Sequence, residues 1–251
     1  MDIPQSSAQS STQSSVDSHN PETHQEAIKY CTDHEITPEL LLFRCSRTGS
    51  IREMKVAKLA GVNIPWDHWK LALRRTVEKG HLNCATLLNE WQEDMSQSWG
   101  ERYLCVLMNV AASRNQIGMM IWLRTLIGDT FNYRRALGFA AQEGHIDVME
   151  YIKDSEENLN ADFAVKMCVS RNQIKSLETL KGWGLVDYDV LLMEIAGYSL
   201  LRDGNDTLEL MFLAKEWGAT NFGPARQRAI KYENHELVKV LAMWEKESES
   251  D

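Results

Sequence analysis

Apolar residues recur along this chain at the spacing of amphipathic helices, in units that average close to 31 residues. Each unit has one position, here called the turn residue, at which a glycine, an asparagine or once a glutamate stands. The turn residues are Gly49, Gly80, Asn115, Gly144, Asn172, Asn205 and Glu233. In the second, third and fourth units, apolar side chains follow two, four, five, seven and eight positions later, as in Ile146, Val148, Met149, Tyr151 and Ile152. The seventh unit has them at the last four of these positions. This spacing defines one broad helical face, so it predicts a helix after each turn residue.

A second helix is predicted before each turn residue. In six units a small residue stands four positions before it, namely Cys45, Thr76, Ala111, Ala140, Cys168 and Ala229. Two closely packed antiparallel helices require such a small slot. Glycine, and less often asparagine, accepts the left-handed conformation that ends a helix. We therefore predict seven helix pairs, in which Asn234 takes over this conformation from Glu233 and an insertion at 197–204 lengthens the sixth turn. The alternative is an unrelated helical bundle in which small slot, turn residue and apolar face recur by chance.

The clearest unit resembles the ankyrin repeat. Residues 140–152 (AAQEGHIDVMEYI) have its paired alanines, its Gly-His turn and its second amphipathic helix, and His81 and His145 match the family's histidine position. The resemblance covers about Thr37 to Trp244 and implies a curved stack of helix pairs used for protein–protein recognition. No unit has the Thr-Pro-Leu-His opening of a standard repeat, so short loops are expected in place of hairpins. Residues 216–222 (EWGATNF) are similar to divergent ankyrin-type repeats of large DNA viruses, which implies a viral origin.

These patterns divide the chain into three parts. Residues 1–25 are rich in Ser and Gln and poor in apolar side chains, which predicts a disordered tail. Residues 26–244 form the all-α, ankyrin-like solenoid of about seven helix pairs, and residues 245–251 form a short acidic tail.

Composition narrows the classes of function. A net charge of −9 argues against binding nucleic-acid phosphates over a broad surface. No stretch approaches the roughly 18 apolar residues of a membrane-spanning helix. Five cysteines, an odd number without a CxxC pair, are typical of a reducing compartment. We expect an intracellular, cytoplasmic protein, in the host cell if it is viral, with no nucleic-acid or membrane partner.

Candidate chemistry is sparse. Cys45 and Cys168 occupy the small slot and Cys84 lies on an apolar face, where a thiol packs as a small hydrophobic group. Cys31 and His34 have ligand-like spacing, but no second pair follows at the spacing of a zinc finger. No nucleophile or phosphate-loop motif is present. We expect no catalytic residue, metal or cofactor, and therefore no enzyme. Because His81 and His145 recur at one repeat position, a structural hydrogen bond at the turn is expected for both.

Four tryptophans lie eleven or twelve residues past their turn residues, at the ends of second helices: Trp91, Trp183, Trp217 and Trp244. The favoured interpretation is that each fills the groove between neighbouring units. The alternative is an exposed aromatic row that marks a binding surface.

The candidate binding surface is the solvent face of the first helices, on the concave side of the array. We expect this face ten, six and two positions before the turn residue. In four units these positions are Lys70, Arg74 and Glu78; Arg134, Gly138 and Gln142; Asp162, Lys166 and Ser170; Gly223, Gln227 and Lys231. Five of the twelve are basic and two are acidic, which favours a partner with an acidic segment. The other interpretation is a solvated face whose charges have no role.

The predicted function is therefore a non-enzymatic protein–protein interaction module, an adaptor or a decoy. Its predicted partner-binding residues are Lys70, Arg74, Arg134, Lys166 and Lys231. The alternative function is that of a structural component of a virus particle.

Overall fold

The computed structural model describes residues 21–61, 63–95, 97–128, 131–198 and 204–248, and every regular element in these ranges is a helix. A leading helix, α1 (His24–Asp33), precedes seven helix pairs. The first helices of the pairs are α2 (Pro38–Thr48), α4 (Trp66–Lys79), α6 (Glu101–Ser113), α8 (Arg134–Glu143), α10 (Asp162–Arg171), α12 (Tyr188–Gly197) and α14 (Phe222–Lys231). The second helices are α3 (Ile51–Ala60), α5 (Leu82–Asp94), α7 (Ile117–Ile127), α9 (Ile146–Ser155), α11 (Ile174–Gly182), α13 (Gly204–Trp217) and α15 (His235–Ser248).

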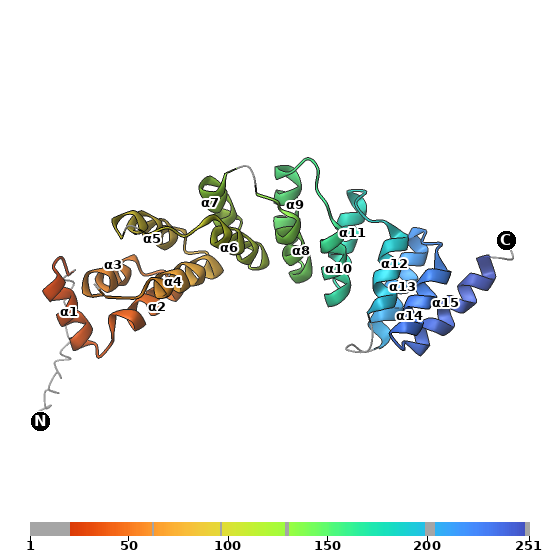
Figure 1. Cartoon of the computed structure of the whole chain (residues 1–251), viewed down its shortest axis with the longest axis horizontal. Helices are drawn as coiled ribbons and strands as arrows, with labels where there is room; N and C mark the ends of the chain where they lie inside the picture. The colour runs from red at the N-terminus through yellow and green to blue at the C-terminus, as the bar shows by residue number, and fades with distance from the viewer. Residues whose placement is uncertain (1–20, 62, 96, 129–130, 199–203, 249–251) are drawn as a thin grey trace, which may run out of the picture.

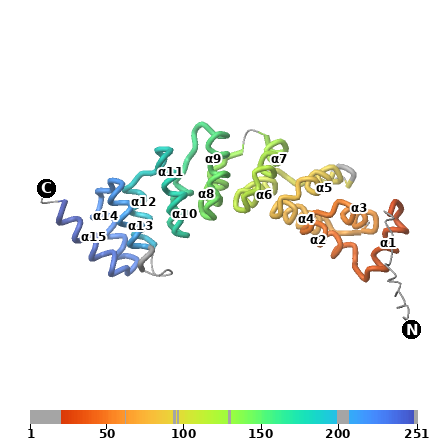
Figure 2. Tube along the Cα trace, turned by 180° about the vertical axis from the view of Figure 1, so that it is seen from behind, coloured from red at the N-terminus to blue at the C-terminus, as the bar shows by residue number. Residues whose placement is uncertain are grey.

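The pairs stack side by side into an elongated, shallow arch (Figure 1). In the middle of the array, α4, α6, α8 and α10 lie on the inner side of the arch, and α5, α7, α9 and α11 lie on its outer side. Figure 2 shows the same two rows from behind. Each first helix packs directly on the next, from α2 through to α14, whereas successive second helices touch little. Because the first helices lie closer together, the array curves toward them. We call the first helices the inner row and the second helices the outer row.

The turns inside the pairs agree with the predicted turn residues at six of the seven places. Gly49, Gly80, Asn115, Gly144, Asn172 and Glu233 all have positive φ, between 53° and 78°. In five pairs the N–H of the next residue donates to the carbonyl of the small-slot residue, as His145 does to Ala140 at 2.9 Å. This bond is characteristic of a Schellman helix end. The turn residue and the carbonyl of the small-slot residue therefore belong to one local motif, whereas the small side chain is required by packing between helices.

Two details of the turns were predicted wrongly. Glu233 itself adopts the left-handed conformation, with φ of 57°, and Asn234 instead accepts a hydrogen bond from the N–H of Leu237. Asn234 thus caps the start of α15, which is the usual role of asparagine before a helix. Asn205 is not a turn residue, because it lies in the first turn of α13. The predicted insertion at 197–204 falls largely outside the described residues.

The predicted small slots lie inside the array. All six predicted residues are fully buried, and Ile195 takes this place in the sixth pair. The inner helices from α2 to α12 bury the positions eight, seven, four and three before the turn residue, such as Ala136, Leu137, Ala140 and Ala141 in α8. In the last inner helix, α14, only Ala225 and Ala229 are buried at these positions. The loops between pairs contain no strand within the described ranges, as expected from the missing Thr-Pro-Leu-His openings.

Both ends of the array are more helical than predicted. Within the predicted tail 1–25, residues 1–20 lie outside the described residues, but α1 already begins at His24 behind a capping box of Thr23 and Glu26. Helix α15 continues past Trp244 to Ser248, so the first residues of the predicted acidic tail are helical. Salt bridges from Arg226 to Glu245 (3.1 Å) and from Lys215 to Glu247 (2.9 Å) hold this last turn against the array.

Candidate partner-binding surface

The solvent face of the inner helices follows from their buried positions. At about 100° per residue, the positions eight, seven, four and three before the turn residue span one side of the helix. The opposite side is centred on the positions nine and two before it. That side points away from the outer row, toward the concave side of the arch. The predicted face used positions ten, six and two before the turn residue, a step of four residues, whereas a helical turn has 3.6. The position ten before the turn residue therefore lies about 90° from the centre of the solvent face.

Apolar side chains occupy the position nine before the turn residue in six of the seven pairs. In the sixth pair, the buried Leu191 and Ile195 set the same register. We call these residues the inner-face row: Leu40, Leu71, Val106, Phe163, Val190 and Pro224. Four of them keep between 37 and 58 % of their surface exposed, namely Leu40, Leu71, Val106 and Val190. Arg135 interrupts the row in the fourth pair. These residues were not among the predicted binding residues, although their constant spacing from the turn residue is visible in the sequence.

The predicted basic residues divide into two groups. Three of them form salt bridges within the chain: Lys70 with Asp67 (3.5 Å), Arg74 with Glu78 (3.0 Å) and Lys166 with Glu194 (3.3 Å). Arg134 and Lys231 are exposed and form no ion pair with the described residues. Exposed ion pairs of this kind contribute little to stability, and they leave less charge for a partner.

Gly138 was assigned to the solvent face, but it is buried. A Cβ atom at this position would lie 2.2 Å from Cδ1 of Phe163. Gly138 therefore allows α10 to approach α8 closely, with Phe163 seated against the glycine and against the edge of Phe139 (5.9 Å between ring centroids). Packing explains this glycine, and nothing in its position serves binding.

The tryptophans fill grooves between neighbouring units, as the favoured interpretation predicted. Each ring is covered by a lysine from the preceding outer helix, at 4.5–5.2 Å from ammonium to ring centroid: Lys58 on Trp91, Lys153 on Trp183, Lys181 on Trp217 and Lys215 on Trp244. Lysine and tryptophan stand at fixed repeat positions. Lys153, for example, lies nine residues after its turn residue, and Trp183 lies eleven residues after the next one. Trp91 and Trp244 are buried and the other two are half-buried. The alternative interpretation, an exposed row of tryptophans that marks a binding surface, is therefore wrong.

The two histidines form structural hydrogen bonds at the turns, as predicted, and these bonds join neighbouring units. Nε2 of His81 donates to the carbonyl of Arg47 (2.9 Å), and Nε2 of His145 donates to the carbonyl of Ser113 (3.1 Å). In each case the acceptor lies two positions before the turn residue of the preceding unit. A carbonyl only accepts, so Nε2 carries the proton. These histidines are structural.

The cysteines behave as packing residues. Cys31, Cys45, Cys84 and Cys168 are buried, and no disulfide joins any of the five. Burial raises the pKa of Cys45 and of Cys168 to about 12, which keeps both thiols neutral. Nδ1 of His34 donates to the carbonyl of Tyr30 (2.8 Å) and does not meet Cys31. Within the described residues, no three His, Cys, Asp or Glu side chains are grouped as metal ligands.

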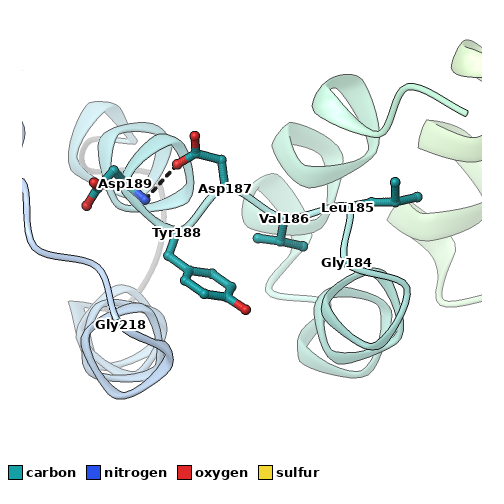
Figure 3. A pocket seen from close by; sticks show the side chains of 7 residues that line it. All are labelled: Gly184, Leu185, Val186, Asp187, Tyr188, Asp189 and Gly218. Carbon is teal, nitrogen blue, oxygen red and sulfur yellow. Dashed lines mark hydrogen bonds between the residues drawn. The ribbon is translucent and has the colours of Figure 1, made fainter.

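A pocket of about 510 Å³ lies between the loops that precede α12 and α14 (Figure 3). Tyr188 projects into the space between Gly184 and Gly218. Asp187 accepts from the N–H groups of Asp189 and Val190 (both 3.0 Å) and so caps α12. Asp189 in turn accepts from the N–H groups of Thr220 and Asn221, at 2.8 and 2.9 Å. Both carboxylates therefore bind backbone N–H groups through Oδ1 and hold the two loops in place.

The sequence matches no protein-family model, and no curated protein matches it either. In the part of the chain that is described, no helix has the length and apolar character needed to cross a membrane.

Proposed function

We propose that this chain is a non-enzymatic protein-binding module, an adaptor or a decoy, which holds its partner on the inner face of the array. The observation that carries the proposal is the inner-face row. A repeated position on a solvent face has no need of leucine or valine for folding. Exposed apolar side chains that line up over many units are typical of protein-interaction surfaces.

The charge of this face points to the character of the partner. The positions ten, nine, six, five and two before the turn residue include ten lysines and arginines and five acidic residues across the seven pairs. The whole chain has a net charge of −9. A basic inner face on an acidic protein favours partners with acidic segments and disfavours nucleic acid, which the rest of the surface would repel.

The proposal includes an ankyrin-like origin of the pairs, supported by the Gly-His turns and by the small slots beneath them. The viral origin and the cytoplasmic location stay part of the same proposal, because they rest on the short likeness at 216–222 and on the five unpaired cysteines.

The test compares two sets of surface substitutions in affinity capture with quantitative mass spectrometry. The inner-face variant is Leu71→Asp with Val106→Asp and Val190→Asp. The matched control is Ile121→Asp with Met243→Asp, which changes exposed apolar residues of α7 and α15 in the outer row. All five side chains are solvent-exposed, so both variants should melt close to the parent.

A partner of the inner face is retained by the parent and by the control, and is lost with the inner-face variant. Proteins that bind all three baits alike, or that are lost only with the outer-row control, would overturn the proposal. The earlier candidates Arg74 and Lys166 are poorer targets. Their reversal would leave Glu78 or Glu194 beside a new carboxylate and confound binding with stability.

A further inference from the structure

One groove of the inner face is open. Between α6 and α8 lies a pocket of about 280 Å³, here called the α6–α8 pocket. Its lining residues are Glu101, Arg102, Cys105, Val106, Asn109, Phe131, Asn132 and Arg135. Val106 belongs to the inner-face row, and Arg135 interrupts that row one unit later. The pocket therefore lies on the path that a partner would follow along the inner face.

The next groove along the array explains why this one is open. Between α8 and α10, Phe163 packs onto Gly138 and closes the space. Between α6 and α8 the residues at the same two repeat positions are Arg135 and Asn109. The charged side chain of Arg135 is exposed to solvent, whereas the ring of Phe163 packs against the neighbouring helix. Phe163 and Gly138 fill the groove between α8 and α10, whereas Arg135 and Asn109 leave the groove between α6 and α8 open.

The two guanidinium groups of the pocket and the amide oxygen of Asn109 lack partners among the described residues. Arg102 and Arg135 are exposed and make no ion pair among the described residues, unlike Arg74 and Lys166 on the same face. Oδ1 of Asn109 is buried without a hydrogen-bond donor. Glu101 is the single carboxylate of the lining, so the two guanidinium groups leave a net positive charge. The pocket offers donors for an anion at its rim and an acceptor for an N–H group deeper in.

We propose that the α6–α8 pocket binds the carboxylate side chain of an aspartate or glutamate in a linear segment of the partner protein. This inference rests on the proposed function of the inner face. Guanidinium groups bind carboxylates through paired, charge-assisted hydrogen bonds, which are stronger than those between neutral groups. Asn109 accepts an N–H group of the same segment, and Val106 and Phe131 supply apolar contact beside it.

The repeat also sets the spacing of the segment. Neighbouring packed helices are about 8–10 Å apart. An extended chain advances about 3.1–3.4 Å per residue, so three residues cover one unit. A segment that crosses the inner row therefore presents its acidic residue to the pocket. Leu71 on α4 and Phe163 on α10 each lie about one and a half units from the pocket, so apolar residues about four positions to either side reach them.

The test selects linear peptides from a phage-displayed random library against the whole chain. The consensus of the enriched peptides is then read, and their affinities are measured by fluorescence polarisation. The pocket variant is Arg102→Glu with Arg135→Glu. Its control is Lys175→Glu with Lys239→Glu, which makes the same charge change at exposed positions of the outer row. Circular dichroism checks that both variants remain folded.

The expected consensus has an acidic residue with apolar residues about four positions away on both sides. The pocket variant should bind these peptides at least about tenfold more weakly, as loss of charge-assisted contacts implies, and the control should bind them like the parent. A repeated selection on the pocket variant should enrich lysine or arginine at the acidic position.

Peptides that lose affinity with Leu71→Asp and Val190→Asp but not with the pocket variant would overturn this inference and leave the proposed function intact. Peptides whose affinity is unchanged by the inner-face substitutions and by the pocket variant would overturn this inference and the proposed function. A library that yields no binder would also overturn the inference of a linear segment, and the capture experiment above would then judge the inner face by itself.

Discussion

The inner and outer rows bind their neighbours by different means. Inner helices pack directly on one another, and from α2 to α12 each helix does so through four buried positions, many of them alanine or other small residues. Outer helices lie farther apart and are bridged by long side chains, as in Lys181 over Trp217 and Lys215 over Trp244.

This difference separates stability from recognition. Direct packing uses one side of each inner helix and leaves the opposite side free, where the inner-face row lies. Bridging side chains occupy the outer helices at the ends where they could otherwise meet a partner. An array of this kind gains stability from nearest-neighbour contacts, so both rows should respond strongly to substitutions at the contacts and weakly elsewhere.

The largest effect is expected for Trp244→Ala in the outer row. The ring is 2 % exposed and lies against the edges of Phe212 and Phe222, so its loss leaves a large cavity. We expect the free energy of unfolding to fall by about 3–5 kcal/mol in urea titrations followed by circular dichroism. Hydrogen exchange should rise mainly in α13, α14 and α15. Met243→Ala, at an exposed neighbour, is the control, and equal effects of the two changes would refute bridging as a source of stability.

Ala140→Leu tests the inner row. Ala140 is fully buried in α8, which packs on α6, α9 and α10, so extra volume has nowhere to go. The expected loss is about 1–3 kcal/mol in the same titration. Arg134→Leu introduces the same side chain at an exposed position of the same helix and should be nearly neutral. If Ala140→Leu were also neutral, the inner helices would not pack as closely as described.

His145→Ala removes one hydrogen bond between units. The carbonyl of Ser113 then lacks its partner, and a loss of about 0.5–1.5 kcal/mol is expected. His235→Ala serves as the control, because that exposed histidine makes no side-chain hydrogen bond to the described residues. Thermal melts of the two variants that coincide would show that the histidine link between units is unimportant.

The smallest effect is expected for Lys181→Met, which keeps the aliphatic stem over Trp217 but removes the ammonium charge. A cation over an aromatic face contributes about 0.5–1 kcal/mol at such a partly exposed site. Lys175→Met removes the same charge from an exposed position of α11 that covers no ring among the described residues. The difference between the melting temperatures of the two variants measures what the ammonium of Lys181 over the Trp217 ring contributes to stability.

Sequence reasoning was most successful where the cause is local. Gly144 and Asn172 could be identified as turn residues because a left-handed backbone restricts the residue type at the turn itself. Ala140 and Cys168 could be identified as small slots because small residues recur four positions before the turn residue. His145 was predicted as a structural hydrogen bond from its recurrence, and its acceptor in the preceding unit agrees with that prediction.

Contacts between units could not be predicted in the same way. Lys181 lies 36 positions before Trp217, and Gly138 lies 25 before Phe163, so neither pair shows itself in a local pattern. The salt-bridge partner of Lys166, Glu194, likewise belongs to the next unit. The sixth turn was misplaced because its pair departs from the common length.

The sequence by itself determined the helix pairs, their turns and their buried stripes, since 3.6-residue periodicity and turn chemistry act within about ten residues. Tertiary structure alone decided which charges are neutralised, which grooves are filled and where the α6–α8 pocket stays open. These properties depend on how one unit sits on the next, and that arrangement is set by side chains some thirty residues apart.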